Sequence, residues 1–404
     1  MRTISPPEAS HAHRMGRAVI EAEPDAEVEV RQLSHEFGFG ATGFEAVPGY
    51  KNSPWDSHRQ DLWLGLFNWA TLPFYWGRFE SAPGRTISAE LRAAAEWFTA
   101  RGVKVKGHPL TWHTGAPAWL ADAPLDQVEA RLRDRVRREV AGFAGLVDVW
   151  DAVNESVIAP VFKAERNAIT RLTWAKGRLA VIGLAFGEAK AANPAATLLL
   201  NDFDLSSAYE CLVEGALAAG VPVDALGLQT HMHQGFRGEE QLRGIVERFG
   251  RFGLPLHFTE TTLVSGDLMP AEIVDLNDYQ IPSWPSTAEG EARQADELVR
   301  HYRTLLAEPA VRAITYWDPF DADAWLGAPS GLVRLDGSPK PAYQALLGLV
   351  RGAWWVAPTT ARADHCGRIA VNAWSGRYSA ATPGGQAQEF EIVRGGSSVV
   401  RLGA

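Results

Sequence analysis

Residues 148–155 read DVWDAVNE, and this stretch decides the fold of the chain. It begins as a short apolar strand after a charged helical segment, and it ends on Asn154 and Glu155 just before a loop. Residues 254–260 (LPLHFTE) have the same construction and end on Glu260. A carboxylate at the end of a buried strand is held rigidly while its tip faces solvent, which is where a barrel enzyme needs an acid. Two such carboxylates, far apart in the sequence, can face each other only if the sheet between them closes.

Strand and helix signals alternate on both sides of these two stretches. Eight strand-like runs separated by helical patterns indicate βαβ units and a parallel sheet, and eight strands close a barrel. We therefore predict an α/β chain whose residues 35–350 form a (β/α)8 TIM barrel. One of its helices is expected to run without a break from about residue 168 to 192. The strand-like runs are 36–41, a run carrying Phe67 and Asn68, 103–108, 148–155, 197–203, 225–231, 254–260 and 311–317.

The two ends of the chain read as β structure. Residues 1–34 contain alternating runs on either side of a turn, which predicts a hairpin, and residues 351–404 contain short alternating strands with Gly-rich turns. A segment as short as this C-terminal one makes only a thin sandwich by itself. We predict that the hairpin pairs with the tail in one small discontinuous β module, which is either a carbohydrate-binding appendage or, as we favour, a structural cap.

Composition excludes several classes of protein. The formal net charge of −9 argues against a nucleic-acid partner, because phosphate binding needs a basic face. No apolar run is long enough to cross a membrane, and the first thirty residues have no apolar core of a signal peptide, so we expect a cytoplasmic protein or one whose leader was removed. The two cysteines, Cys211 and Cys366, cannot build a disulfide framework and are expected to be free, buried thiols. We expect a monomer.

Polar and aromatic side chains gather at the ends of the predicted strands, where a barrel has its active site. Two glutamates surrounded by amides, imidazoles and indoles suit glycoside hydrolysis, in which one carboxyl group protonates the leaving oxygen and the other attacks or activates water. Any one of these residues has an ordinary structural explanation, but the set as a whole does not. The strand-end residues are His108, Trp112, Asn154, Glu155, Asn201, Asp202, Gln229, His231, Glu260 and Trp317.

These residues lie within a series of short motifs that spans most of the chain. The motifs are FGFG at 37–40, FN at 67–68, VKGHPLTWH at 105–113, WDAVNE at 150–155, LLLNDFD at 198–204, LGLQTH at 226–231, FTE at 258–260, YWDPFDADAW at 316–325 and GSPKPAY at 337–343. In order and spacing they resemble the family 10 glycoside hydrolases, the β-1,4-xylanase family. The resemblance implies a retaining glycoside hydrolase that acts on an oligo- or polysaccharide, xylan-type or a related β-glycoside, and needs no cofactor.

The resemblance also implies a role for each matching residue. Glu155 is expected to be the general acid/base and Glu260 the nucleophile, with the two carboxyl groups about 5–5.5 Å apart. The pKa of Glu155 should be raised by burial and by the charge of Glu260. Asn154 is expected to hydrogen-bond the sugar 2-hydroxyl, while Gln229 and His231 position the carboxylates. The remaining substrate-binding residues are expected to be Asn68, His108, Trp112, Trp317 and Trp325.

The chain departs from the family at the glycone subsites. Where the family usually carries Glu-Asn and, three residues on, Lys, this sequence has Pro73-Phe74 and Gly77. Gly115 stands where the family often has Gln, and Thr261-Thr262 replaces the Leu-Asp that follows the nucleophile. Because hydroxyl recognition depends on paired donors and acceptors, these changes predict altered sugar discrimination. The sequence leaves open the sugar and whether cleavage is endo or exo.

Two rival interpretations remain. His231 and His233 lie two apart on a strand, and Asp202 could approach them, as in a zinc site. His231 already has a role beside the nucleophile, so we expect no metal. The second rival is a catalytically silent barrel that binds a glycan. Loss of the glycone groups favours it, whereas the presence of Glu155 and Glu260 together disfavours it. Among enzymes, the alternative is a β-glycosidase for a non-xylan substrate.

Overall fold

The computed structural model describes residues 3–4, 11–162 and 167–402. Eight parallel strands close into one barrel, which confirms the predicted (β/α)8 fold. The ring closes where Ala313–Tyr316 pair with Gly38–Ala41. Most strands are buried along nearly their whole length, as in parallel sheets covered by helices. In order round the barrel they are β4 (Gly38–Thr42), β5 (Trp69–Pro73), β8 (Lys104–His108), β9 (Val149–Asn154), β10 (Thr197–Asp202), β11 (Ala225–Met232), β12 (Leu256–Leu263) and β13 (Val311–Tyr316).

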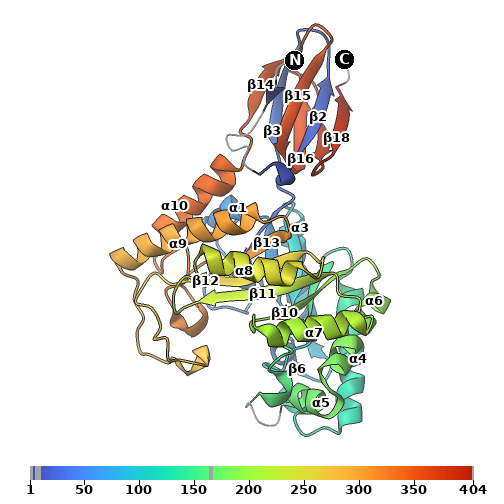
Figure 1. Cartoon of the computed structure of the whole chain (residues 1–404), viewed down its shortest axis with the longest axis vertical. Helices are drawn as coiled ribbons and strands as arrows, with labels where there is room; N and C mark the ends of the chain where they lie inside the picture. The colour runs from blue at the N-terminus through green and yellow to red at the C-terminus, as the bar shows by residue number, and fades with distance from the viewer. Residues whose placement is uncertain (1–2, 5–10, 163–166, 403–404) are drawn as a thin grey trace.

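Helices surround the barrel (Figure 1), and most of the residues that they bury are apolar. A short excursion of α2 (Trp76–Phe79), β6 (Glu80–Ala82) and β7 (Arg85–Thr86) separates β5 from the next helix. The surrounding helices are α1 (Ser57–Leu66), α3 (Ser88–Thr99), α4 (Leu125–Gly142), α5 (Ala168–Lys176), α6 (Arg178–Ala192), α7 (Ser207–Ala218), α8 (Glu239–Gly250), α9 (Ala288–Ala307) and α10 (Pro341–Gly348).

The prediction of one unbroken helix from 168 to 192 was wrong. The chain forms α5 and α6, separated at Gly177, whose φ is +85°. A left-handed residue ends a right-handed helix, and glycine adopts that conformation without a steric penalty. Ala-rich periodicity continues through the break, which is why the sequence pattern concealed it.

Strands from the two ends of the chain share two four-stranded sheets that stand at one end of the molecule, with both termini on them (Figure 1). In each sheet an N-terminal strand lies between C-terminal strands. The side chains of Trp374, in one sheet, and Tyr378, in the other, are buried, and the Tyr378 hydroxyl donates to the Trp374 carbonyl at 2.7 Å. The sheet orders are β1 (Thr3–Ile4), β15 (Arg368–Trp374), β2 (Met15–Glu21), β18 (Ser397–Arg401), and β14 (Thr359–Arg362), β3 (Glu27–Gln32), β16 (Gly376–Ala381), β17 (Gln388–Ile392).

The division of the chain into a barrel over 35–350 and a module of 1–34 and 351–404 remains our proposal, and so does the module's function as a cap. Both cysteines are free, but the expectation that they are buried was wrong, because Cys211 and Cys366 are exposed. Cys211 occupies the outer side of α7, and Cys366 lies in the turn before β15. Over the residues that the structure describes, no helix has both the length and the apolar character needed to cross a membrane.

Candidate active site

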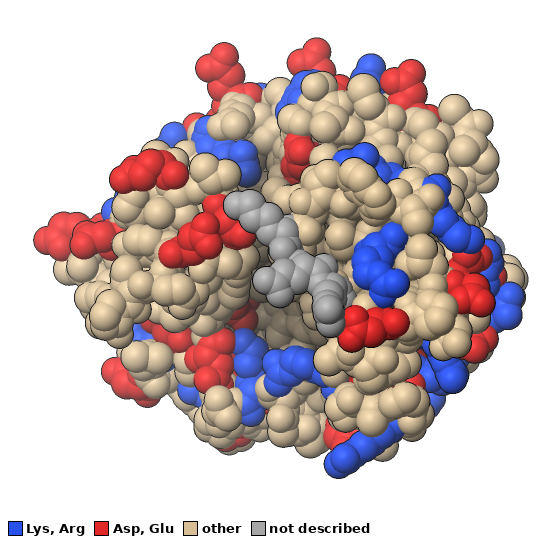
Figure 2. Space-filling model, turned by 90° about the horizontal axis from the view of Figure 1, so that it is seen from below, with Lys and Arg blue, Asp and Glu red and all other residues tan. Residues whose placement is uncertain are grey.

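Most of the predicted site residues come together at the carboxyl ends of the barrel strands. Seen from below, the molecule is hollowed between its two sides, and acidic and basic side chains both surround the hollow (Figure 2). Neither sign of charge dominates this surface, as suits an uncharged ligand better than a phosphate backbone. The strand-end residues are His108 at the end of β8, Asn154 and Glu155 at the end of β9, Gln229 and His231 in β11, Glu260 in β12, and Trp317 directly after β13.

Both glutamates have an unusual backbone. Glu155 has φ +56° and Glu260 has φ +58°, so each adopts the left-handed conformation that residues with side chains rarely use. Such a conformation costs about 1–3 kcal/mol and clusters at functional sites. The N–H of Glu155 is held by the carbonyl of Asn201 at 2.8 Å, and the register of β12 shifts at Glu260. The local bend turns each carboxylate inward from the end of its strand.

Glu155 is surrounded by neutral hydrogen-bond donors. Its carboxylate accepts from Trp112 Nε1 at 2.8 Å, from Asn154 Nδ2 at 3.2 Å and from Gln229 Nε2 at 3.3 Å. Burial and the nearby charge of Glu260 raise the pKa of Glu155 to about 8, although the bonds from Trp112 and Gln229 act against the rise. At neutral pH, Glu155 is therefore mostly protonated and can donate a proton.

Glu260 is more deeply buried than Glu155 and has imidazole neighbours. His231 Nε2 lies 3.1 Å from its Oε2, His108 Nε2 lies 4.0 Å from its Oε1, and Asn201 Nδ2 donates to the same Oε1 at 2.8 Å. Burial raises the pKa of Glu260, but the charge of His108 and the hydrogen bond and charge of His231 outweigh it, so the pKa is below its usual value. Glu260 is thus ionised at neutral pH and can act as a nucleophile.

A buried ion pair fixes the orientation of His108. Its Nδ1 lies 2.7 Å from Asp151 Oδ2, and Lys106 Nζ lies 2.8 Å from the same oxygen. Burial raises the pKa of Asp151, but Lys106 and His108 together lower it to about 2. An ionised Asp151 accepts the proton of His108 Nδ1, which leaves His108 Nε2 facing Glu260.

A chain of amide side chains connects the two glutamates. Asn201 Nδ2 donates to Glu260 and, at 2.6 Å, to Asn154 Oδ1. Gln229 Nε2 donates to the same Asn154 oxygen at 3.1 Å and to Glu155. Neutral amides fix the positions of both carboxylates without adding charge, so the difference in their protonation is left to burial and to the imidazoles.

Aromatic rings form the walls around these groups. Trp317 contacts His108 and His231 with ring centroids 5.1 and 6.1 Å apart, and Trp325 contacts His231 at 4.8 Å. Trp112 lies beside Tyr75, with 5.5 Å between centroids. Indole faces of this kind are suitable stacking surfaces for the apolar faces of pyranose rings.

Asn68 does not belong to this group, and its assignment as a substrate-binding residue is corrected. It immediately precedes β5, at the opposite end of the barrel. Its Oδ1 accepts from the N–H of Phe39 at 2.8 Å, and its Nδ2 donates to the carbonyls of His35 and Phe37. The motif that contains Asn68 is therefore structural, because the amide satisfies backbone groups where two strands begin.

Thr262, two residues after Glu260, lies beside His231. Its Oγ1 lies 3.4 Å from His231 Nδ1, and Thr262 is the residue that stands in place of the family's Asp. Thr262 also lies 3.4 Å from His233 Nδ1 and accepts from the N–H of Met232 at 3.1 Å. A hydroxyl can orient the imidazole but supplies no charge. Among the described residues, no group of His, Cys, Asp or Glu side chains has an arrangement that could hold a metal ion.

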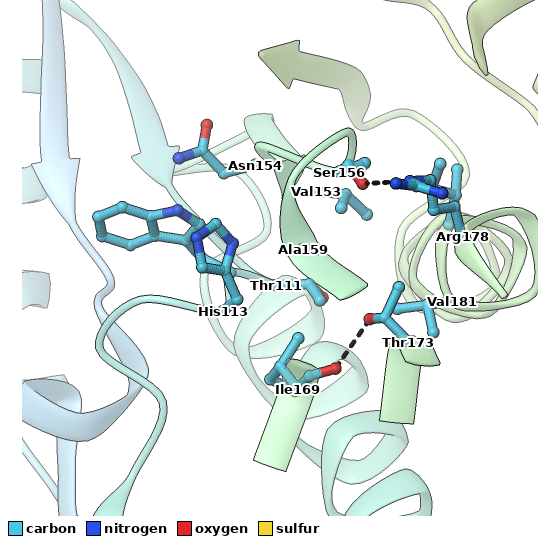
Figure 3. Close-up of a pocket in the computed structure, with 12 residues that line it drawn as sticks. Thr111, His113, Val153, Asn154, Ser156, Ala159, Ile169, Thr173, Arg178 and Val181 are labelled. Carbon is cyan, nitrogen blue, oxygen red and sulfur yellow. Dashed lines mark hydrogen bonds between the residues drawn. The ribbon is translucent and has the colours of Figure 1, made fainter. Parts of the chain in front are cut away.

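A small pocket lies next to Asn154 (Figure 3). Asn154 and His113 lie on one side of it, and residues of α5 and α6 lie on the other. Arg178 donates to the carbonyls of Ser156 and Val157, which anchors the loop that follows Glu155. The Thr173 hydroxyl donates to the Ile169 carbonyl within α5. The pocket thus lies beside the loop that follows Glu155, and its residues hold that loop in place.

Sequence reasoning assigned no role to several residues that complete the site. Asp151 and Lys106 were within quoted motifs, and their alternation with His108 along adjacent strands was the available signal. Asn201 was recognised as a strand-end residue. Its two hydrogen bonds, to Asn154 and to Glu260, form only because three strands bring these residues together. Tyr75 gave no signal, because it lies within an apolar run.

Comparison with known proteins matches this chain to the family 10 glycosyl hydrolases. The model of the family described as glycosyl hydrolase family 10 matches residues 76–349. Endo-1,4-beta-xylanase B of Thermotoga neapolitana is 28% identical over 265 residues, which cover 61% of this chain and 69% of that protein. Beta-1,4-xylanase of Dictyoglomus thermophilum is 28% identical over 236 residues, which cover 56% of this chain and 62% of that protein. A GH10 structure from Paenibacillus barcinonensis superposes with a TM-score of 0.65 and 25% identity over 78% of this chain and 95% of that one.

Proposed function

Because the chain belongs to glycosyl hydrolase family 10, we propose that it cleaves β-1,4-linked xylan-type or related β-glycosidic substrates by a retaining double displacement. Its partner would be an oligo- or polysaccharide, as the names of its xylanase relatives suggest. One observation carries the proposal: two buried strand-end glutamates, joined by neutral amides, have pKa values moved in opposite directions. That difference supplies one proton donor and one nucleophile at the same pH.

The first step would form a covalent intermediate. An oxygen of ionised Glu260 attacks the anomeric carbon as the glycosidic bond breaks, and Glu155 gives its proton to the leaving oxygen. Glu260 becomes a neutral ester, which removes the charge that helped to raise the pKa of Glu155. In the second step, ionised Glu155 takes a proton from water as the water oxygen attacks the anomeric carbon. The bond to Glu260 breaks, and Glu260 leaves as a carboxylate.

The neighbouring residues support particular parts of this reaction. His108 and His231 stabilise the ionised nucleophile, and Asn154 lies between the two carboxylates, from which position we propose that it contacts the sugar 2-hydroxyl. Gln229 holds the acid/base, while Trp317 and Trp325 would flank the reacting sugar.

A β-glycosidase for a non-xylan substrate is the second candidate. The observation that favours it is the absence of polar side chains at Pro73, Phe74 and Gly77. A silent glycan-binding barrel is less well supported, because a binding protein has no use for a buried carboxylate with a pKa near 8 beside another that stays ionised.

The test is hydrolysis of aryl β-xyloside, β-xylobioside, β-glucoside and β-cellobioside alongside xylan, with product anomers followed by NMR. We expect the β-anomer to form first and Glu260→Ala to abolish turnover. Azide should restore turnover of Glu155→Ala on a good leaving group and yield the β-glycosyl azide. Glu139→Gln, at a buried glutamate on α4, is the control. Binding without hydrolysis of any substrate, or initial formation of the α-anomer, would overturn the proposal.

A further inference from the structure

The three glycone positions that depart from the family offer no polar group to a sugar. Phe74 is fully buried, and its ring packs against Phe79 and Trp150 on the outer side of the barrel wall, with centroids 5.7 and 4.8 Å away. The N–H of Gly77 donates to the Gly115 carbonyl at 2.7 Å, and a Cβ at Gly77 would lie 2.8 Å from that oxygen. No side chain fits there without moving the backbone, so the position of the family's lysine is closed.

Tyr75, the residue between these positions, faces the reacting groups instead. Its ring meets His108 edge-on at 5.5 Å and lies 5.5 Å from Trp112. The side chain is half-buried, and no hydrogen bond joins its hydroxyl to another described residue. Burial raises the pKa of Tyr75 well above its usual value, and the charges of Glu260 and Glu155 act in the same direction. The hydroxyl therefore remains a proton donor at every working pH.

The space behind Tyr75 is filled. Phe44 meets the Tyr75 ring at 6.0 Å and the Trp317 ring at 5.5 Å, and Tyr50 meets Phe44 at 5.7 Å. Phe44 and Tyr50 are 4% and 7% exposed, so both rings are packed away from solvent. The Arg78 guanidinium covers the outer face of Tyr50 at 3.8 Å. The packed rings of Tyr75, Phe44 and Tyr50 thus occupy the space on this side of the reacting groups.

We propose that Tyr75 is a specificity-determining residue that ends the glycone side after one sugar and donates its hydroxyl hydrogen bond to that sugar. Phe44 and Tyr50 support the ring from behind. The substrate class is then a β-glycoside with a single pyranose on the glycone side, so that cleavage releases a monosaccharide from a chain end. This inference rests on the proposed function, because it uses the same two glutamates.

The experiment compares kcat/KM for an aryl β-xyloside and an aryl β-xylobioside. A working second subsite makes the xylobioside much the better substrate, whereas a closed one makes the two equal or favours the xyloside. In wild type we expect a ratio of one or less. Tyr75→Phe should lower kcat/KM on the xyloside about five- to tenfold, the effect of one lost hydrogen bond. The double variant Tyr75→Ala/Phe44→Ala should open the space and raise the ratio above that of wild type.

The controls separate this inference from the proposed function. Tyr279→Phe, in the long segment between β12 and α9, should leave both constants unchanged. Calorimetric titration of the Glu260→Ala variant with the two glycosides needs no turnover, and equal affinities are expected. If Glu260→Ala abolishes hydrolysis but wild type prefers the xylobioside by tenfold or more, or Tyr75→Phe has no effect, the Tyr75 inference fails alone. If nothing is hydrolysed, the proposed function fails, and the titration still decides the subsite.

Discussion

The two strand-end glutamates are built alike but are protonated differently. Glu155 directly follows β9 and Glu260 lies within β12, each has a left-handed backbone, and their side chains are 13% and 6% exposed. Neutral donors surround the first, whereas His108 and His231 face the second. Burial alone would push both pKa values upward. The difference teaches that the fold sets the positions of the two carboxyl groups, and that the nearby imidazoles decide which of them stays ionised.

The largest effect on kcat/KM should come from substituting Glu155, the proposed proton donor. In Glu155→Gln, kcat/KM for an aryl glycoside with a poor leaving group should fall about 10³- to 10⁴-fold, and much less for a good one, because only the former needs a proton. Wild-type activity should decline as pH rises through about 8, where Glu155 loses the proton it must donate. The measurement is the pH profile of kcat/KM for both substrates.

The absence of this alkaline decline is the decisive feature expected of the Glu155→Gln profile. Glutamine does not titrate, so the residual activity of the variant on the good leaving group should be flat between pH 6 and 9. A decline that persisted in the variant would mean that another group controls it. Glu139→Gln should retain the wild-type profile.

Much of this comparison was accessible from sequence, because both glutamates end strands with an apolar pattern and lie in motifs whose order is distinctive. The chain could be recognised as a barrel from alternation alone. Asn68 was misplaced because a motif does not say which end of a strand its residue occupies. Tyr75 was missed because Leu72 to Trp76 is uniformly apolar in sequence, and only the pairing of β5 with β8 and the turn into α2 decide which rings face inward.

The partners of the glutamates were also only partly predictable. Hydrogen bonds such as Asn201 to Asn154 and Glu260 join residues from three strands, and their directions depend on side-chain torsions rather than on spacing. The Lys106–Asp151–His108 group is local to two adjacent strands and could have been anticipated. Long-range polar contacts are the part of a site that pattern reasoning captures least well.

A smaller effect should follow from replacing an imidazole beside Glu260 with a neutral amide, like those beside Glu155. His231→Gln keeps a donor near Glu260 Oε2 but removes the imidazole charge that lowers the pKa of Glu260. That pKa should rise, so the acidic limb of kcat/KM should move to higher pH by about one unit, with a loss of about tenfold at pH values below the limb and little change near neutrality. The pH profile of kcat/KM checks this. His233→Gln, at a histidine with no bond to Glu260, should leave the limb in place, and equal shifts in both variants would contradict the assignment.

The smallest expected effect concerns the surroundings of Glu260, the proposed nucleophile. Thr262→Asp places a carboxylate near His231 Nδ1, which lies 3.4 Å from the present hydroxyl. An adjacent negative charge favours the imidazolium form, which in turn stabilises ionised Glu260, so the acidic limb should move to lower pH by less than about one unit. Because position 262 is buried, the new charge should also lower the thermal stability. Thr262→Asn has the same shape without the charge, and it should destabilise less and leave the limb unmoved. Identical profiles for the Asp and Asn variants would show that the imidazole is controlled by hydrogen-bond geometry alone and not by charge.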